Sequence, residues 1–117
     1  MKEYLLLFRN ASAADGYMAT AQDMATDMPL WQSWIGNIAM QGKLVTTAPI
    51  EYHSTVVTNT TVEVGPYKEA NTVLVSGFLI CKSDNVEEVQ QWSKGCPILK
   101  YPNSSVEIRT VVPFPLG

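Results

Sequence analysis

The order of the hydrophobic patterns constrains this chain most, because two helical segments are set between strand-like runs. An apolar run over residues 3–9 (EYLLLFR) is typical of a strand buried on both faces. Apolar residues then recur at helical spacing over residues 28–41, and a second helical pattern covers residues 83–95. Further strand-like segments follow each helix. The expected order is therefore strand, helix, several strands, helix, strand.

Capping residues set the expected bounds of the first helix. Asp27 is a candidate N-cap, and Pro29 would then lie in the first turn, where its missing N–H costs nothing. Gly42 is expected just past the end of the helix. Residues 17–27 are left open as one or two earlier helical turns.

The remaining segments are bounded by turn residues. A hairpin is expected around Asn59, within residues 54–64. The strongest strand pattern covers residues 72–82, and an alternating last strand covers residues 105–112. The second helix is expected to end at Gly95 and to be capped by one of three residues, Ser83, Asp84 or Asn85.

This order of elements is the split βαβ arrangement of ferredoxin-like folds, so the predicted class is α+β with an extra β-hairpin. Two helices on one face of a mostly antiparallel sheet leave the other face bare. A bare apolar sheet face requires a partner. The simplest arrangement is a homodimer whose sheets pack face to face.

Composition limits the classes of function. The 117 residues suit one domain, residues 1–117. The net charge is −3 and the eight basic residues are scattered, so no nucleic-acid partner is expected. The longest apolar stretch, residues 72–81, is too short for a membrane span, and the N-terminal residues lack a signal-peptide pattern. We therefore expect no membrane partner.

Cysteine and histidine content bears on redox state and metals. The two cysteines, Cys81 and Cys96, do not form a CxxC motif, which favours a reduced, cytoplasmic protein. A single His and no CxxC leave too few ligands for a metal site. No phosphate-binding glycine-rich loop is present in the sequence. We therefore expect neither a metal nor a cofactor.

The chain resembles the YCII-related family, in its DGPF subgroup. The resemblance rests on five parts of the sequence: KEYLLLFR at 2–9, the Trp-containing helix ending in GKLV at 42–45, GPY at 65–67, SGFLICKSDNVEEVQQWSKGCP at 76–97 and VEIRTVV at 106–112. It implies a dimeric α+β barrel. The chain departs from the family pattern where Val64 stands for an Asp and Tyr67 for a Phe. Asn71 and Thr72 stand for a Lys-Glu pair, and Ser76-Gly77 stands for a double glycine. These departures favour ligand binding or regulation over catalysis.

The GPY motif has a structural and a functional interpretation. Gly65 permits unusual backbone conformations, and Pro66 keeps its predecessor out of the helical region, so together they predict a sharp bend after a strand. The functional hypothesis is that the bend places Tyr67 and Glu69 at the mouth of a pocket. The bend is the favoured interpretation.

The candidate catalytic residues are His53 and Glu69. His53 is the only His, and Glu51 lies two positions earlier, on the same face of a predicted strand. Such a pair could transfer a proton, although a lone His at a strand start is more often a surface residue. The candidate ligand-binding residues are Tyr67, Arg9 and Trp34. At helical spacing, tryptophans more often belong to the core than to a ligand cavity.

Two functions remain open from the sequence. The favoured one is a homodimer that binds or responds to a small ligand. The alternative is a metal-independent enzyme performing acid–base chemistry, isomerisation or elimination, on a small organic acid or ring compound.

Overall fold

A computed structural model describes residues 1–11, 21–51, 53–65 and 73–114. A four-stranded antiparallel sheet has the strand order β2-β5-β1-β6. Its strands are β1 (Lys2–Ala11), β2 (Leu44–Pro49), β5 (Val73–Ser83) and β6 (Ser105–Thr110). The helices are α1 (Ala21–Met40), α2 (Val86–Lys94) and a short 3-10 helix, η2 (Pro97–Lys100). This topology confirms the predicted α+β, ferredoxin-like fold.

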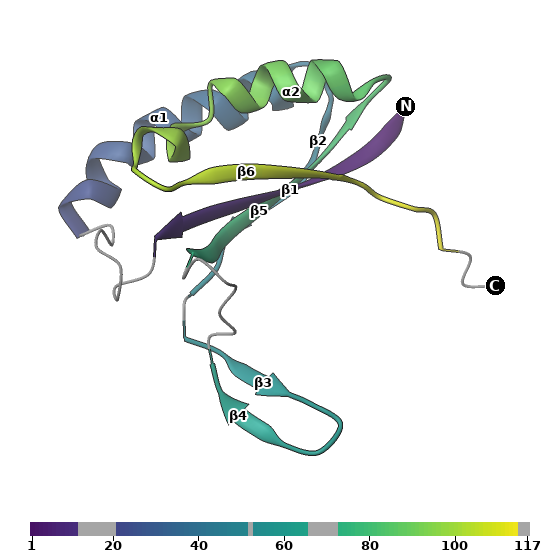
Figure 1. Cartoon of the computed structure of the whole chain (residues 1–117). Helices are drawn as coiled ribbons and strands as arrows, with labels where there is room; N and C mark the ends of the chain where they lie inside the picture. The colour runs from purple at the N-terminus through teal and green to yellow at the C-terminus, as the bar shows by residue number, and fades with distance from the viewer. Residues whose placement is uncertain (12–20, 52, 66–72, 115–117) are drawn as a thin grey trace.

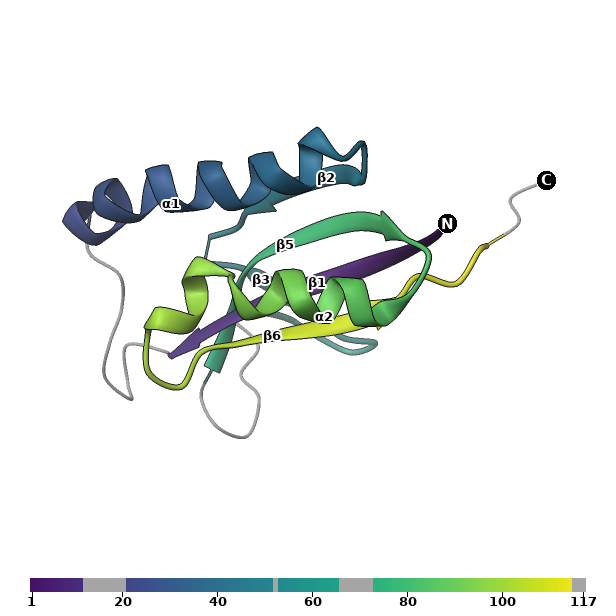
Figure 2. The same ribbon diagram turned by 90° about the horizontal axis from the view of Figure 1, so that it is seen from above.

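The predicted hairpin is also present, as a separate two-stranded sheet. It consists of β3 (Thr55–Val57) and β4 (Val62–Val64). Both helices lie on one face of the large sheet, whereas the hairpin extends away on the other side (Figure 1). Seen from above, the hairpin lies beneath the sheet, on the side away from the helices (Figure 2).

Alternation along β1 separates the two faces of the sheet. Tyr4, Leu6 and Phe8 are buried and belong to the core beneath the helices. Leu5 and Leu7 face the other side, paired with Ile80 and Phe78 of β5, and all four are half-buried. The sequence predicted that β1 is buried on both faces. Within one chain, only the face of β1 that lies beneath the helices is buried.

The start of α1 differs from the expectation. The helix begins at Ala21, so Pro29 lies inside it and Asp27 is not its N-cap. Instead, the side chain of Asp27 is buried and bonds with Lys100 and Tyr101. We infer that these contacts offset the one backbone hydrogen bond that an internal proline removes. The earlier helical turns left open by the sequence are therefore real.

The other helix boundaries agree with the predictions. Gly42 has a positive φ of 70° and its N–H bonds to Ala39 O at 2.9 Å, as expected just after a helix. Asn85 caps α2, because its side chain accepts a hydrogen bond from the Glu88 N–H at 2.9 Å. Gly95 ends α2.

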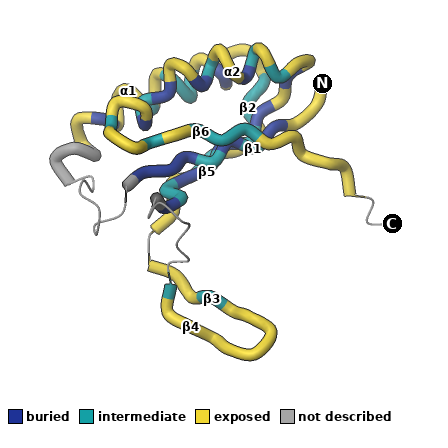
Figure 3. Tube along the Cα trace, viewed as in Figure 1, coloured by how far each residue is buried: buried dark blue, intermediate teal, exposed yellow. Residues whose placement is uncertain are grey.

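Three aromatic rings join α1 to the sheet. Phe8 of β1 contacts Trp31 and Trp34 edge to face, with centroid distances of 5.1 and 5.9 Å. The indole N–H of Trp34 donates to Trp92 O of α2 at 2.9 Å, which ties the two helices together. The buried residues gather between the helices and the sheet, while the hairpin is almost wholly exposed (Figure 3). Among the described helices, none has the length and apolar character needed to cross a membrane.

Candidate functional site

A cavity of about 320 Å³ lies between α1 and the sheet, and its walls are mainly apolar. The size suits a small organic molecule. Trp31 and Ile35 of α1 form one wall, and Phe8 and Gly77 of the sheet form another. Asn10, Asp27 and Tyr101 bring polar atoms to the lining.

Asp27 is the charged group of this cavity, and it is 5% exposed. One carboxylate oxygen, Oδ1, forms an ion pair with Lys100 Nζ. The other, Oδ2, accepts a hydrogen bond from the Tyr101 hydroxyl. Because a buried carboxylate needs such partners, this network holds a fixed negative charge at the cavity wall.

The end of α2 determines where these partners lie. Gly95 ends the helix, and Pro97 then starts η2, which presents Lys100 and Tyr101 toward the first half of α1. Pro97 suits that place because the first helical positions need no N–H partner. A break in α2 therefore builds one side of the site.

A bulge in the sheet shapes the opposite wall. The pairing of β1 with β5 shifts between Phe8 and Arg9, where the hydroxyl of Ser76 donates to Phe8 O at 3.3 Å. A Cβ at Gly77 would lie 3.1 Å from Ala48 O, so glycine permits the close approach of β2. Ser76 and Gly77 both line the cavity.

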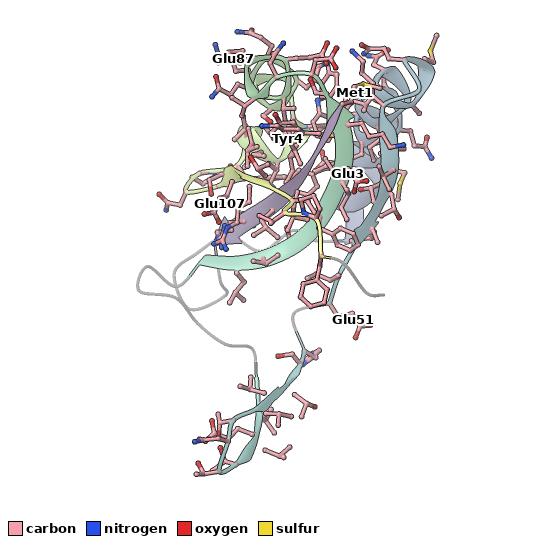
Figure 4. The ribbon with its side chains drawn as sticks, turned by 90° about the vertical axis from the view of Figure 1, so that its right-hand side faces the viewer. Met1, Glu3, Tyr4, Glu51, Glu87 and Glu107 are labelled. Carbon is pink, nitrogen blue, oxygen red and sulfur yellow. The ribbon has the colours of Figure 1, made fainter. Side chains whose placement is uncertain are left out.

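The predicted site residues do not meet in the described part of the chain. His53 and Glu51 are exposed, in the segment that leads into β3. Glu51 lies near the root of the hairpin, well away from Glu107 on β6 (Figure 4). Tyr67 and Glu69 lie outside the described residues, so a role for these two residues and for His53 stays a prediction.

Arg9 and Trp34 occupy two different places. Arg9 lies on the sheet face away from the helices, and its Nη1 is 2.6 Å from Glu107 Oε1. This hydrogen bond and the guanidinium charge lower the pKa of Glu107. Trp34 belongs to the aromatic cluster, whereas its neighbour Trp31 lines the cavity. Ligand binding by Arg9 and Trp34 stays a prediction.

The polar residues of the cavity were missed by the sequence reasoning. Asp27 precedes Trp31 by four positions, so a helix drawn from Ala21 places a carboxylate on the apolar face. The spacing of Asp27 and Trp31 could therefore have placed Asp27 inside the helix, whereas the sequence pattern before Pro29 predicts Asp27 as an N-cap. Nothing around Asn10 or Tyr101 marks them in the sequence, because β1 and the residue after η2 bring them to the cavity only in the folded chain.

Neither cysteine offers a nucleophile. Cys81 and Cys96 are free and buried. Burial raises the pKa of Cys81 to about 11, with a further contribution from the charge of Glu88, and raises the pKa of Cys96 to about 12. Within the described ranges, no three His, Cys, Asp or Glu side chains gather in a way that could hold a metal ion.

No protein-family model matches the sequence, and no curated protein matches it as a relative. One similar solved structure is the 5-chloro-2-hydroxyhydroquinone dehydrochlorinase TftG from Burkholderia phenoliruptrix AC1100, in complex with 2,5-dihydroxybenzoquinone. The two chains are 13% identical, the match covers 90% of each, and the TM-score is 0.48.

Proposed function

We propose that this chain is a cytoplasmic, YCII-related protein of the DGPF type that binds a small organic ligand in the cavity beneath α1 and acts as a homodimer. The cavity supports this proposal best, because it combines apolar walls with a few fixed polar groups. That combination is typical of small-molecule sites. The proposed unit is one domain, residues 1–117.

The lining indicates the class of ligand. Phe8, Trp31 and Ile98 offer mainly apolar contact, which suits a ring or a compact hydrocarbon skeleton. Asn10 and the Asp27–Tyr101 pair offer polar contacts at the wall. The expected ligand is therefore a small, mainly apolar compound with one or two hydroxyl or amine groups.

The hydrogen bonds of the Asp27 carboxylate favour ligand binding over catalysis. Both of its oxygens already bond with Lys100 and Tyr101, so it serves as an anchor. A general base needs room to accept a proton from its substrate. The replacement of the family's Asp by Val64 and of its Lys-Glu pair by Asn71 and Thr72 points the same way.

The open face of the sheet supports the homodimer. Leu5, Leu7, Phe78 and Ile80 form an apolar centre on the face that the helices do not cover. Water contact with such a face is unfavourable, and a second copy would remove it. Light scattering should then give about twice the chain mass of 12.9 kDa.

The enzyme alternative rests on the same Asp27–Tyr101 pair. A phenol that donates to a buried carboxylate beside an apolar cavity can relay a proton. Tyr101 would take a proton from a bound ring compound while Asp27 takes the phenolic proton of Tyr101. The reverse transfer would return the proton to another atom of the same compound, which is isomerisation, or to a departing group, which is elimination, and neither step needs a metal.

Ligand binding is tested by a metabolite screen read by thermal shift, because binding to the folded state raises the midpoint. A matched pair of variants locates the site. Met28 lines the cavity and Met40 does not, although both are exposed residues of α1. Met28→Trp should reduce the shift given by a hit, and Met40→Trp should leave it unchanged. Equal shifts in both variants would place binding elsewhere.

Catalysis is tested on the same hits. Each is incubated with the protein in D₂O and followed by proton NMR. Turnover or deuterium uptake that depends on Tyr101, and is lost in Tyr101→Phe, would favour the enzyme. Tight binding with no chemical change would favour the binding protein.

A further inference from the structure

The β3–β4 hairpin has one apolar face, which is mostly exposed to water. Val57 pairs with Val62, and Thr55 pairs with Val64, so these four residues share a face of the hairpin. Val57, Val62 and Val64 are 72%, 70% and 94% exposed. Glu63 lies on the opposite face, paired with Val56. The three exposed valines therefore lie together on one face of the hairpin.

The hairpin is well formed despite this exposure. At its tip, the Thr58 N–H donates to Thr61 O at 2.8 Å, and the Thr61 N–H donates to Thr58 Oγ1 at 2.9 Å. At its root, the Gly65 N–H donates to Ser54 O at 2.8 Å. An isolated two-stranded hairpin is only marginally stable in water. A hairpin that is hydrogen-bonded at its tip and root, yet exposes a valine face, therefore indicates that another surface packs against this face in the assembled protein.

We propose that this apolar hairpin face, Val57, Val62 and Val64, docks on a second copy of this chain and clasps it. The proposal rests on the homodimer inferred above and adds a contact to it. The hairpin extends on the side of the sheet opposite the helices, where the second copy would bring its own sheet (Figures 1 and 2). Two-fold symmetry then places each hairpin against the other subunit.

The size of the interface favours the clasp. The four strands have 10, 6, 11 and 6 residues, which at a rise of about 3.3 Å and a spacing of about 4.8 Å give the open sheet face a footprint of about 500 Å². A stable interface usually buries about 800 Å² on each partner. The sheet face alone is small by that measure, and the hairpin adds exposed apolar residues on the same side.

Charge on the open face permits a second copy to approach. Glu107 bonds with Arg9 at 2.6 Å and with Arg109 at 3.3 Å. Opposite charges therefore lie next to one another along the β6 side of the face. A second copy that approaches this side meets these paired charges rather than a run of one sign.

Photo-crosslinking tests the contact without disturbing the fold. Benzoylphenylalanine replaces Val62 in one sample and Glu63 in the other, and each is mixed with an isotope-labelled wild-type chain. We expect crosslinks between chains from position 62 and at least fivefold fewer from position 63. Crosslinks confined to one chain, or equal yields from both positions, would overturn the clasp.

Sedimentation equilibrium tests its contribution. Val57, Val62 and Val64 are together replaced by Thr, which keeps the β-branched shape of each residue, and Glu63→Thr is the matched control. We expect the dimer dissociation constant to rise at least tenfold in the triple variant and less than threefold in the control. A wild-type dimer with an unchanged constant in the triple variant overturns the clasp alone. A wild-type monomer overturns the proposed homodimer as well.

Discussion

The hydroxyl of Tyr101 donates a hydrogen bond to the carboxylate of Asp27, 74 positions earlier in the chain, at the wall of the cavity. Lys100 bonds with the other oxygen of the same carboxylate. One acidic side chain thus joins α1 to the segment that follows α2. The network fixes both the wall of the candidate site and the packing of the two halves of the fold.

Removing parts of this network should lower stability in a definite order. Tyr101→Phe should lower the free energy of unfolding by about 1–2 kcal/mol, because Asp27 loses one bond while buried. Asp27→Ala should cost about 2–3 kcal/mol, less than a fully buried pair would, because Lys100 is partly solvated. Urea unfolding measures both.

The control for this series is Asp84→Ala. The side chain of Asp84 is 80% exposed, so the change should stay within about 0.5 kcal/mol of wild type. If Tyr101→Phe proves as stable as wild type, the hydroxyl does not hold Asp27 in solution.

Trp34 and Trp31 should separate structure from binding. Trp34→Phe removes the indole N–H that bonds to Trp92 O and part of a half-buried ring, so it should cost about 1–3 kcal/mol. Quenching of fluorescence by a ligand of the cavity should survive in Trp34→Phe and fall in Trp31→Phe, because Trp31 lines the cavity. The reverse pattern would restore Trp34 as the ligand-binding residue.

Periodicity was enough to predict the fold but not the site. Residues 72–82 form a long apolar run that indicates a strand, the helices show apolar residues at helical spacing, and Asn59, Gly42 and Gly95 mark turns by local chemistry alone. Asp27 shows the limit of such reasoning. Its short side chain suits an N-cap, and only the distant Lys100 and Tyr101 make it a buried residue of a helix that starts at Ala21.

Acidification should reveal the contact between Glu88 and Ser83. The Ser83 hydroxyl lies 2.6 Å from Glu88 Oε1, and Lys43 Nζ lies 2.9 Å away. These hydrogen bonds, Ser83 first, lower the pKa of Glu88 in the folded chain. The stabilisation is therefore present above the unfolded pKa, near pH 4.3, and is lost as the pH falls through the lower folded pKa.

Glu88→Gln is the variant that measures this effect. At pH 7 it should lower the free energy of unfolding by about 1 kcal/mol, and the difference from wild type should shrink below about pH 4. Glu87→Gln, at an exposed neighbouring position, is the control. A difference that stays constant down to pH 3 would contradict a lowered pKa.

Both thiols should react slowly in the folded protein. The raised pKa values, about 11 for Cys81 and about 12 for Cys96, leave almost no thiolate at pH 8, and both side chains are buried. Alkylation by iodoacetamide at pH 8 should be at least 100-fold slower than in urea, and mass spectrometry should find no intramolecular disulfide. Rapid labelling of either residue without denaturant would show that its part of the core opens readily.

Gly65 should be required for space rather than for its backbone freedom. Of the glycines in the described segments, Gly42 alone has a positive φ. A Cβ at Gly65 would lie 1.9 Å from Ser54 Oγ and 3.0 Å from Val56 Cγ2. Gly65→Ala should therefore loosen the root of the hairpin, and hydrogen exchange of its amides should become at least threefold faster. Ser54→Gly in the same chain should restore much of the protection, because it removes the obstructing hydroxyl. Equal exchange in the single and double variants would mean that the backbone conformation, as the sequence suggested, is what excludes other residues at position 65.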